Sequence, residues 1–135
     1  MRFRLCVVLL LLSGGAAAAP GPEAAAQEVA RAWLALVDGG NYADSWTQAA
    51  TLFRANVTEA QWQSAAEGAR GPVGALKSRQ VQSASFRRDL PGAPDGEYVV
   101  ILFASAFRGK ASAIETVTVM KDKDGSWRVA GYYLK

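Results

Sequence analysis

The sequence predicts an α+β fold in which three N-terminal helices pack on a curved four-stranded antiparallel meander sheet. The first observation is a change of hydrophobic period, from helical spacing in the first half of the chain to alternation in the second. The second observation is that the alternating segments are joined by short connections, which favour antiparallel pairing of successive strands. The third is that the segment 97–107, EYVVILFASAF, is apolar on both of its faces. A strand of this kind lies between two layers, so we expect cover on both sides of the sheet.

Three amphipathic patterns in the first half predict helices over residues 20–38, 41–56 and 58–70. Gly39 and Gly40 end the first pattern, and Asn41 is a suitable N-cap for the second. Thr58 and Gln61 have the spacing of a capping box at the start of the third. The apolar stripes are Val29, Trp33, Leu36 and Val37 in the first, Tyr42, Trp46, Ala49, Ala50 and Phe53 in the second, and Trp62, Ala65, Ala66 and Ala69 in the third.

The second half predicts four strands, over residues 78–89, 97–107, 112–122 and 126–134. In the second strand Tyr98, Val100, Leu102 and Ala104 are expected on one face, and Val99, Ile101, Phe103 and Phe107 on the other. In the fourth, Trp127 and Val129 are expected on one side, and Ala130 and Tyr132 on the other. The helices cover only one face of such a sheet. We therefore expect the other face to be covered by curvature of the sheet, by the N-terminal segment, or by a partner in a homodimer.

The first 19 residues have the pattern of a secretory signal peptide. Arg2 and Arg4 precede an unbroken apolar run, residues 5–12, which is followed by small residues with A-x-A cleavage sites. The run is shorter than a membrane-spanning helix requires, although an uncleaved anchor is the alternative interpretation. The prediction is a mature domain over residues 20–135, periplasmic or secreted, with no stable membrane insertion after cleavage.

Loss of the signal peptide removes the only cysteine, Cys6, and the chain contains no histidine. Disulfides, thiolate or imidazole metal sites and histidine-based catalysis are therefore excluded for the mature domain. Arg2 and Arg4 account for two of the 15 basic residues, so the mature chain carries 13 against 12 acidic residues. Such a balance offers no basic surface for nucleic acid. No cofactor is expected, and KDKDG at 121–125 has too few ligands for a calcium loop.

Two groups of residues are candidates for a pocket or an interaction site. Tyr42 and Asp44 lie beside the turn between the first two helices, where Asp38 also stands, although helix ends explain both aspartates without a site. Glu115 is the more informative acid, because it stands inside a strand among β-branched residues and needs a partner if it faces inward. The candidate partners on the adjacent strand are Arg128, Tyr132 and Tyr133. The alternative is a structural ion pair or a solvent-facing position.

Three arginines on the first predicted strand, Arg79, Arg87 and Arg88, admit two interpretations. They could bind an anion or a partner, or they could protect a solvated edge strand by charge. The second interpretation is the commoner one for a polar edge strand.

Several sequence blocks together resemble a known family. They are LVDGGNYADSW, RGPVGALKSR, LPGAPDGEYVVI and ETVTVMKDKDGSWRVAGYY, and with the segments between them they cover residues 27–135. The combination resembles a family of short exported bacterial proteins catalogued as domain of unknown function 4019. The order of helices and strands is also similar to the cystatin-like and nuclear-transport-factor-two-like α+β rolls, a likeness of fold only. The resemblance brings no established activity and no catalytic residues.

Three functional hypotheses follow. The first is a non-enzymatic exported module that binds an unknown protein partner. The second is a small-molecule pocket protein for a small apolar ligand, with acid-base chemistry from Glu115 or an aspartate. The third is an accessory or inhibitor-like domain that uses an exposed edge or the loop at residues 90–97. The absence of histidine and cysteine favours the first and third hypotheses over an enzyme.

Overall fold

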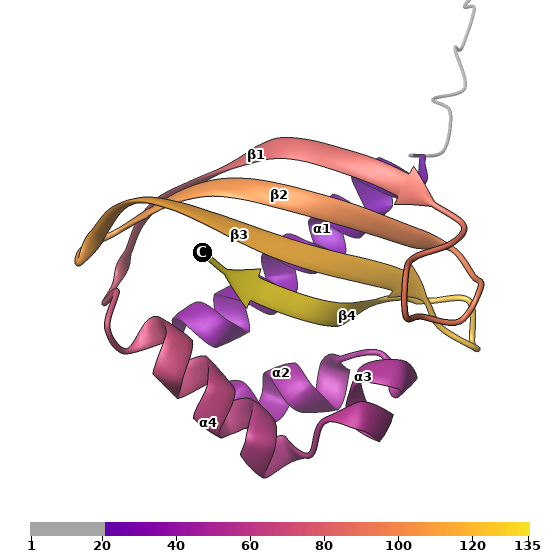
Figure 1. Ribbon diagram of the computed structural model, residues 1–135, viewed down its shortest axis with the longest axis horizontal. Helices are drawn as coiled ribbons and strands as arrows, with labels where there is room; N and C mark the ends of the chain where they lie inside the picture. Colours follow the sequence, from indigo (N-terminus) through magenta and orange to yellow (C-terminus); the bar gives the residue numbers. More distant parts are fainter. Residues whose placement is uncertain (1–20) are drawn as a thin grey trace, which may run out of the picture.

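Four helices precede a four-stranded antiparallel sheet in the computed structural model, which describes residues 21–135 (Figure 1). The predicted signal peptide lies outside the described residues. The helices are α1 (Pro22–Asp38), α2 (Tyr42–Gln48), α3 (Thr51–Asn56) and α4 (Glu59–Arg70), and the strands are β1 (Leu76–Arg87), β2 (Tyr98–Phe107), β3 (Lys110–Lys121) and β4 (Trp127–Leu134). The α+β fold is as predicted, with one more helix than expected.

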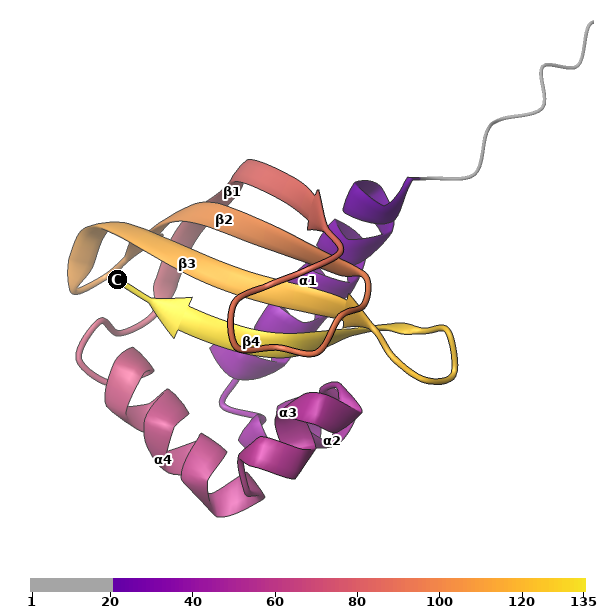
Figure 2. The same cartoon turned by 45° about the vertical axis from the view of Figure 1, so that its right-hand side comes forward.

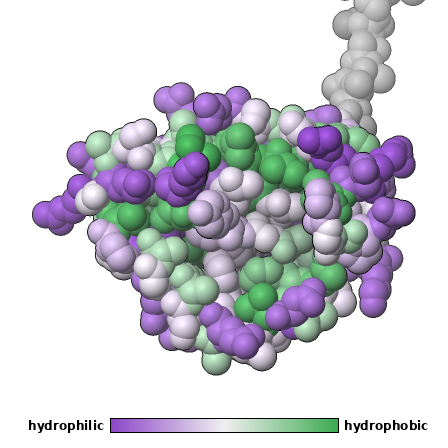
Figure 3. All heavy atoms as spheres, viewed as in Figure 1, coloured by the Kyte–Doolittle hydropathy of each residue, from purple (hydrophilic) through white to green (hydrophobic). Residues whose placement is uncertain are grey.

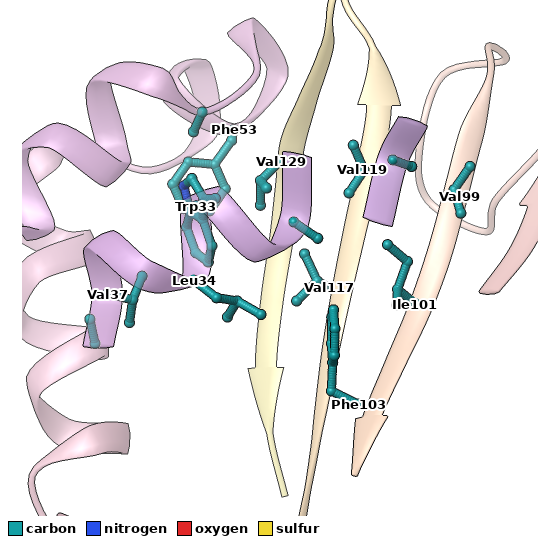
Figure 4. Packing of buried hydrophobic residues seen from close by; sticks show 14 of the residues in the cluster. Trp33, Leu34, Val37, Phe53, Val99, Ile101, Phe103, Val117, Val119 and Val129 are labelled. Carbon is teal, nitrogen blue, oxygen red and sulfur yellow. The ribbon is translucent and has the colours of Figure 1, made fainter. Parts of the chain in front are cut away.

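Helix α1 crosses one face of the sheet and supplies much of the core. Pro22 stands in the first turn, where its missing N–H is not needed, and the helix ends at Asp38 with Gly39 as its C-cap. Gly40 then takes a left-handed φ of 74°, which turns the chain toward α2. The buried residues of the helix are Ala26, Ala30, Trp33, Leu34 and Val37. Two alanines in this face allow α1 to lie close to the strands, and Figure 4 shows Trp33, Leu34 and Val37 beside the sheet.

The second predicted helix is interrupted, because the chain is extended at Ala49 and Ala50, with ψ values of 162° and 152°. Both alanines are fully buried. The N–H of Ala50 donates to the carbonyl of Val129 on β4 at 2.8 Å, so a bond to the sheet edge replaces a helical one. At the start of α3, the N–H and hydroxyl of Thr51 both donate to Asp122, which lies 71 residues further along the chain. These tertiary bonds explain why a continuous helical pattern forms two helices.

The capping box predicted for α4 is confirmed. The N–H of Gln61 donates to the hydroxyl of Thr58 at 3.1 Å, and the N–H of Thr58 donates to the side chain of Gln61 at 3.0 Å. By contrast, Asn41 occupies the N-cap position of α2 without a capping side-chain bond. Instead, three tryptophan indole N–H groups link the helical segments. Trp33 donates to Ser45 O, Trp46 donates to Val57 O, and Trp62 donates to Ser45 Oγ.

The strands pair in the order β1-β2-β3-β4, the predicted antiparallel meander. Register shifts interrupt β1 twice and also occur in the β2–β3 and β3–β4 pairs. The shift in the β3–β4 pair places Val119 opposite Val129 and Val117 opposite Tyr132, so Ala130 is an extra residue. Val129 and Tyr132 consequently pack on the same core. The prediction that they face opposite sides was wrong, because a bulge reverses the alternation.

The core lies between α1 and the concave face of the sheet. In its main cluster the helices meet Val99, Ile101, Phe103, Val117, Val119 and Val129 of the strands (Figure 4), and Val73, Phe107 and Ala113 form a smaller second cluster. Each of these strand residues of the main cluster is fully buried. Replacing one of the larger ones with alanine would cost about 2–5 kcal/mol, as for other buried aliphatic or aromatic side chains.

The opposite face of the sheet, which we call the outer face, is only partly covered. The β1–β2 loop crosses it at one end, in front of β3 and β4 (Figures 1 and 2). This loop buries Tyr98, whose hydroxyl donates to the carbonyl of Pro94 at 2.5 Å. Further along the same face Val100 and Leu102 are half-buried. The expected cover is therefore supplied in part by a loop that was not among the three candidates.

Candidate functional site

Glu115 on β3 is the most deeply buried charged residue of the described chain, with none of its surface exposed. Its two carboxylate oxygens accept four hydrogen bonds. Oε1 accepts from Nε of Arg79 at 2.7 Å and from the hydroxyl of Ser105 at 2.6 Å. Oε2 accepts from Nη2 of Arg79 at 3.1 Å and from the hydroxyl of Tyr132 at 2.5 Å. Burial of a carboxylate is tolerated only when it is paired in this way.

Arg79 on β1 holds two carboxylates at once. Its Nε and Nη2 face Glu115, while Nη1 and Nη2 donate to Asp38 at the end of α1, at 2.8 and 2.9 Å. The planar fork of the guanidinium group makes two bidentate contacts possible from one side chain. Through this residue the first strand, the third strand and the first helix are fixed to one another.

Arg70, at the end of α4, completes the cluster. Its Nη2 donates to Asp38 at 2.7 Å, and its guanidinium group lies 4.8 Å from the ring centroid of Phe107, a cation–π arrangement. Only 7% of Arg70 is exposed, and its Nε and Nη1 have no hydrogen-bond partner within the described residues. The two carboxylates and two arginines balance in charge. We call Asp38, Arg70, Arg79, Ser105, Glu115 and Tyr132 the buried polar cluster.

Tyr132 joins the buried polar cluster to the aromatic part of the core. Its ring lies 5.7 Å from Trp33 and 6.1 Å from Trp62, measured between centroids, and the contact with Trp62 is edge-to-face. The two tryptophans are themselves 5.4 Å apart and share Ser45 as a hydrogen-bond acceptor. The hydroxyl end of the tyrosine is thus directed to Glu115 by a ring that the helices hold in place.

The electrostatics of the cluster keep Asp38, Arg79 and Tyr132 in their usual charge states. Burial would raise the pKa of Asp38, but hydrogen bonds from Arg79 and Arg70 outweigh it and lower that pKa. Burial would lower the pKa of Arg79, but its bonds to Asp38 and Glu115 raise it. Burial and the bond to Glu115 both raise the pKa of Tyr132 well above its ordinary value. At neutral pH the tyrosine therefore stays protonated and donates.

This arrangement has little capacity for acid-base chemistry. A general base needs a lone pair directed at a proton of the substrate, within hydrogen-bond reach. Each oxygen of Glu115 already accepts two bonds from protein donors, and its side chain does not reach the surface. The geometry instead fixes four strands and two helices at one end of the sheet.

The other residues singled out in the sequence lie elsewhere. Tyr42 and Asp44 line a polar hollow of about 300 Å³ between the α1–α2 turn and α4, and no member of the buried polar cluster lines it. Arg128 does not contact Glu115 but pairs with Asp124 at 2.9 Å and with Asp122 at 3.6 Å. Tyr133 points away from the core with 63% of its surface exposed. Among the candidate partners, Tyr132 is the one that contacts Glu115.

Sequence reasoning missed Arg79 as the main partner of Glu115, and missed Asp38, Arg70 and Ser105 as members of the cluster. Arg79 was interpreted as an edge-strand charge, yet only 10% of its side chain is exposed. One signal in the sequence could have placed Arg79 on the inward face of its strand. Further along the same strand, Val81 and Ala84 are apolar and pack on the core. The bulge between Val81 and Ser83 obscured that alternation.

Residues 21–135 lack two further kinds of feature. They contain no group of three or more acidic, histidine or cysteine side chains placed to hold a metal ion. No helix in that range is sufficiently long and apolar to cross a membrane.

Comparison with known proteins identifies a family whose description states no function. No curated protein matches the chain. The sequence profile of the family described as "Protein of unknown function (DUF4019)" matches residues 29–132, which include the helices from the middle of α1 onward, strands β1 to β3, and β4 as far as Tyr132. Every member of the buried polar cluster falls within the match. Since the match covers most of the chain, the protein belongs to the DUF4019 family.

Proposed function

We propose that this protein is an exported, non-enzymatic interaction module whose contact surface is the outer face of the sheet. The observation that carries the proposal is an uncharged patch at the centre of that face. Three cross-strand rows form it: Gln80, Ala104 and Ile114; Ser83, Leu102, Thr116 and Tyr133; and Ser85, Val100, Thr118 and Gly131. None of these residues carries a charge. Figure 3 shows mainly apolar and intermediate surface across the middle of this face.

The patch has the composition of an interface. Interface centres are poor in charged residues and rich in aromatic ones, and exposed tyrosines frequently contribute much of the binding energy. Tyr133 is the one large hydrophobic side chain of residues 21–135 that is strongly exposed. It stands at the β4 end of the middle row, opposite Thr116.

A second copy of the chain is the partner we propose for this patch. In a two-fold dimer each patch meets itself, so an uncharged patch avoids the like-charge repulsion that a charged one would create. From strand spacing and rise, the three rows cover roughly 400 Å². That is about half of the 800 Å² per partner in a standard interface. The dimer is therefore expected to be weak, with a dissociation constant in the micromolar range.

Sedimentation velocity between about 1 and 200 μM tests the homodimer. We expect the mature wild-type chain to shift from monomer to dimer over this range. Tyr133→Lys should remain monomeric, because it places two lysines in the self-complementary contact. Gln63→Lys, on the exposed face of α4, is the control with the same added charge and should dimerise like the wild type. A monomeric wild type at every concentration would refute the homodimer.

Export is the other part of the proposal, and it rests on the sequence of residues 1–19. Expression of the full chain in a bacterial host, followed by fractionation and mass spectrometry, should yield a periplasmic protein that begins near residue 20. A full-length protein in the cytoplasmic fraction would contradict it. The alternative function, an acid-base pocket at Glu115, receives less support because Glu115 is fully buried and both of its carboxylate oxygens accept hydrogen bonds from the protein.

A further inference from the structure

A second surface feature lies at the opposite end of the sheet from the buried polar cluster. It is a hollow of about 470 Å³ between α3, the β1–β2 loop and the end of β3. Apolar side chains form most of its surface, namely Leu52, Ala55, Pro94 and Met120, with Lys121, Asp122 and Lys123 along one side. We call it the α3 groove. Its volume lies within the usual range of small-molecule sites, roughly 300–1,000 Å³.

Both walls of the α3 groove are held in place by specific bonds. On one side, the carboxylate of Asp122 accepts from the N–H and the hydroxyl of Thr51, which fixes the start of α3 to the β3–β4 turn. On the other side, the hydroxyl of the buried Tyr98 donates to Pro94 O, and the N–H of Gly96 donates to Arg88 O. The groove is thus a preformed feature, which lowers the entropic cost of occupying it.

One end of the α3 groove continues into a polar hollow of about 200 Å³. The two hollows share Thr51, Asp122 and Lys123, and the polar one adds Arg54 and Arg128 among its lining residues. Arg128 is already paired with carboxylates. Arg54 and Lys123 form no ion pair within the described part of the chain; Nε of Arg54 donates only to the carbonyl of Ala49. An apolar trough therefore ends beside two cations that lack an acidic partner.

We propose that the α3 groove binds a single-chain amphiphile with an anionic head group. Its alkyl chain lies along Leu52, Ala55 and Met120, and its carboxylate or phosphate group lies at Arg54 and Lys123. Apolar burial supplies the affinity, and the two cations set the orientation and select the charge of the head. This inference does not depend on the proposed dimer, because none of the groove residues belongs to the uncharged patch.

The charge distribution favours a free amphiphile over a membrane or a peptide. The groove also carries Asp95 on the loop, and Asp124 lies beside Arg128, so the surface around it is of mixed sign. A membrane surface is attracted by a surplus of cations on one face, whereas the basic residues of this region, Arg54, Lys121, Lys123 and Arg128, are interspersed with aspartates. A hollow of about 470 Å³ between two fixed walls matches one alkyl chain better than a bulky partner.

Isothermal titration of the mature wild-type protein with dodecanoate, below its micelle concentration, tests the proposal. We expect one site per chain with a dissociation constant of about 10–100 μM, typical of ligand efficiency at this size. Ala55→Trp fills the trough and should weaken binding at least tenfold, whereas Ala60→Trp, exposed on α4, should leave it unchanged. Lys123→Glu should weaken it about fivefold, whereas Lys77→Glu, with the same change of net charge, should not.

Head-group probes complete the design. Dodecyl phosphate in place of dodecanoate identifies which anion is preferred, and tight binding of either supports the proposal. Dodecyltrimethylammonium should bind at least tenfold more weakly than the anions. Absence of binding at 1 mM, equal effects of the two tryptophan variants, equal affinity for the cationic probe, or binding to anionic vesicles without binding to dodecanoate would each overturn the proposal.

Discussion

Replacing Glu115 with glutamine is the most informative perturbation of the buried polar cluster. The change keeps the shape of the side chain and removes its charge. Glutamine has one carbonyl oxygen and one amide nitrogen, so one of the two acceptor positions becomes a donor. If the nitrogen takes the place of Oε2, it faces the hydroxyl of Tyr132 and Nη2 of Arg79. The hydroxyl can turn and accept, but the guanidinium N–H cannot.

The expected loss of stability follows from these contacts. A hydrogen bond to a charged group contributes about 1.5–3 kcal/mol, and at least one is lost. Arg79 also keeps only Asp38 as a counter-ion, while it remains buried. Breaking a buried ion pair from one side costs about 3–5 kcal/mol. We therefore expect Glu115→Gln to reduce the free energy of unfolding by about 3 kcal/mol, a large part of the stability of a domain of this size.

Urea denaturation followed by tryptophan fluorescence measures this loss. With an m value of about 1.5 kcal/mol/M, the midpoint should fall by about 2 M. Glu97→Gln is the matched control, because the side chain of Glu97 is 36% exposed and pairs with Lys121 at a distance of 3.7 Å. That variant should lie within about 0.5 kcal/mol of the wild type. If Glu115→Gln unfolds at the same urea concentration as Glu97→Gln, the cluster does not hold this end of the sheet.

Three other predictions use the same denaturation assay. Arg79→Met should reduce the free energy of unfolding by about 3–5 kcal/mol, because it leaves two carboxylates without their shared partner. Arg70→Met should reduce it less, because the change also removes two buried donors that have no partner. Equal losses would contradict this ranking. Tyr132→Phe should flatten the decline of stability above about pH 10, because the folded wild type retains a proton that the unfolded tyrosine releases; an unchanged alkaline slope would refute it. Asp122→Ala should reduce the free energy of unfolding by about 1–2 kcal/mol, because α3 loses its cap. Asp124→Ala should be near neutral, because the side chain of Asp124 is 56% exposed, against 6% for Asp122. Similar losses for the two variants would exclude the cap.

The fold class and the order of elements could be predicted because each depends on local pattern. The period of apolar residues distinguishes helix from strand, and the capping box of Thr58 and Gln61 defined the start of α4 within one residue. The division of the second helix could not be predicted. Its cause is the bond from Ala50 to Val129 and the cap from Asp122, and both acceptors lie more than 70 residues away in the sequence.

The candidate site could be predicted only in part, for a related reason. An acid among β-branched residues identifies Glu115 as a residue that needs a partner, and the neighbouring strand correctly offers Tyr132. The arginine comes from β1, which is separated from β3 by β2, and it reaches Glu115 diagonally past Ser105. Which residues of β1 face inward depends on two register shifts that leave no clear trace in the pattern of apolar residues.

The two ends of the sheet consequently differ in what they can do. At the end where α1 and α4 terminate, the buried polar cluster uses nearly all its hydrogen-bonding capacity internally, so it has little left for a ligand. At the other end, the β1–β2 loop and α3 enclose an apolar trough beside Arg54 and Lys123, which form no ion pair among residues 21–135. Internally satisfied polar groups are thus concentrated at one end, and unused binding capacity at the other and on the outer face. A ligand in the α3 groove should therefore protect α3 and the β1–β2 loop from amide hydrogen exchange, and leave the exchange of Glu115 and its neighbours unchanged.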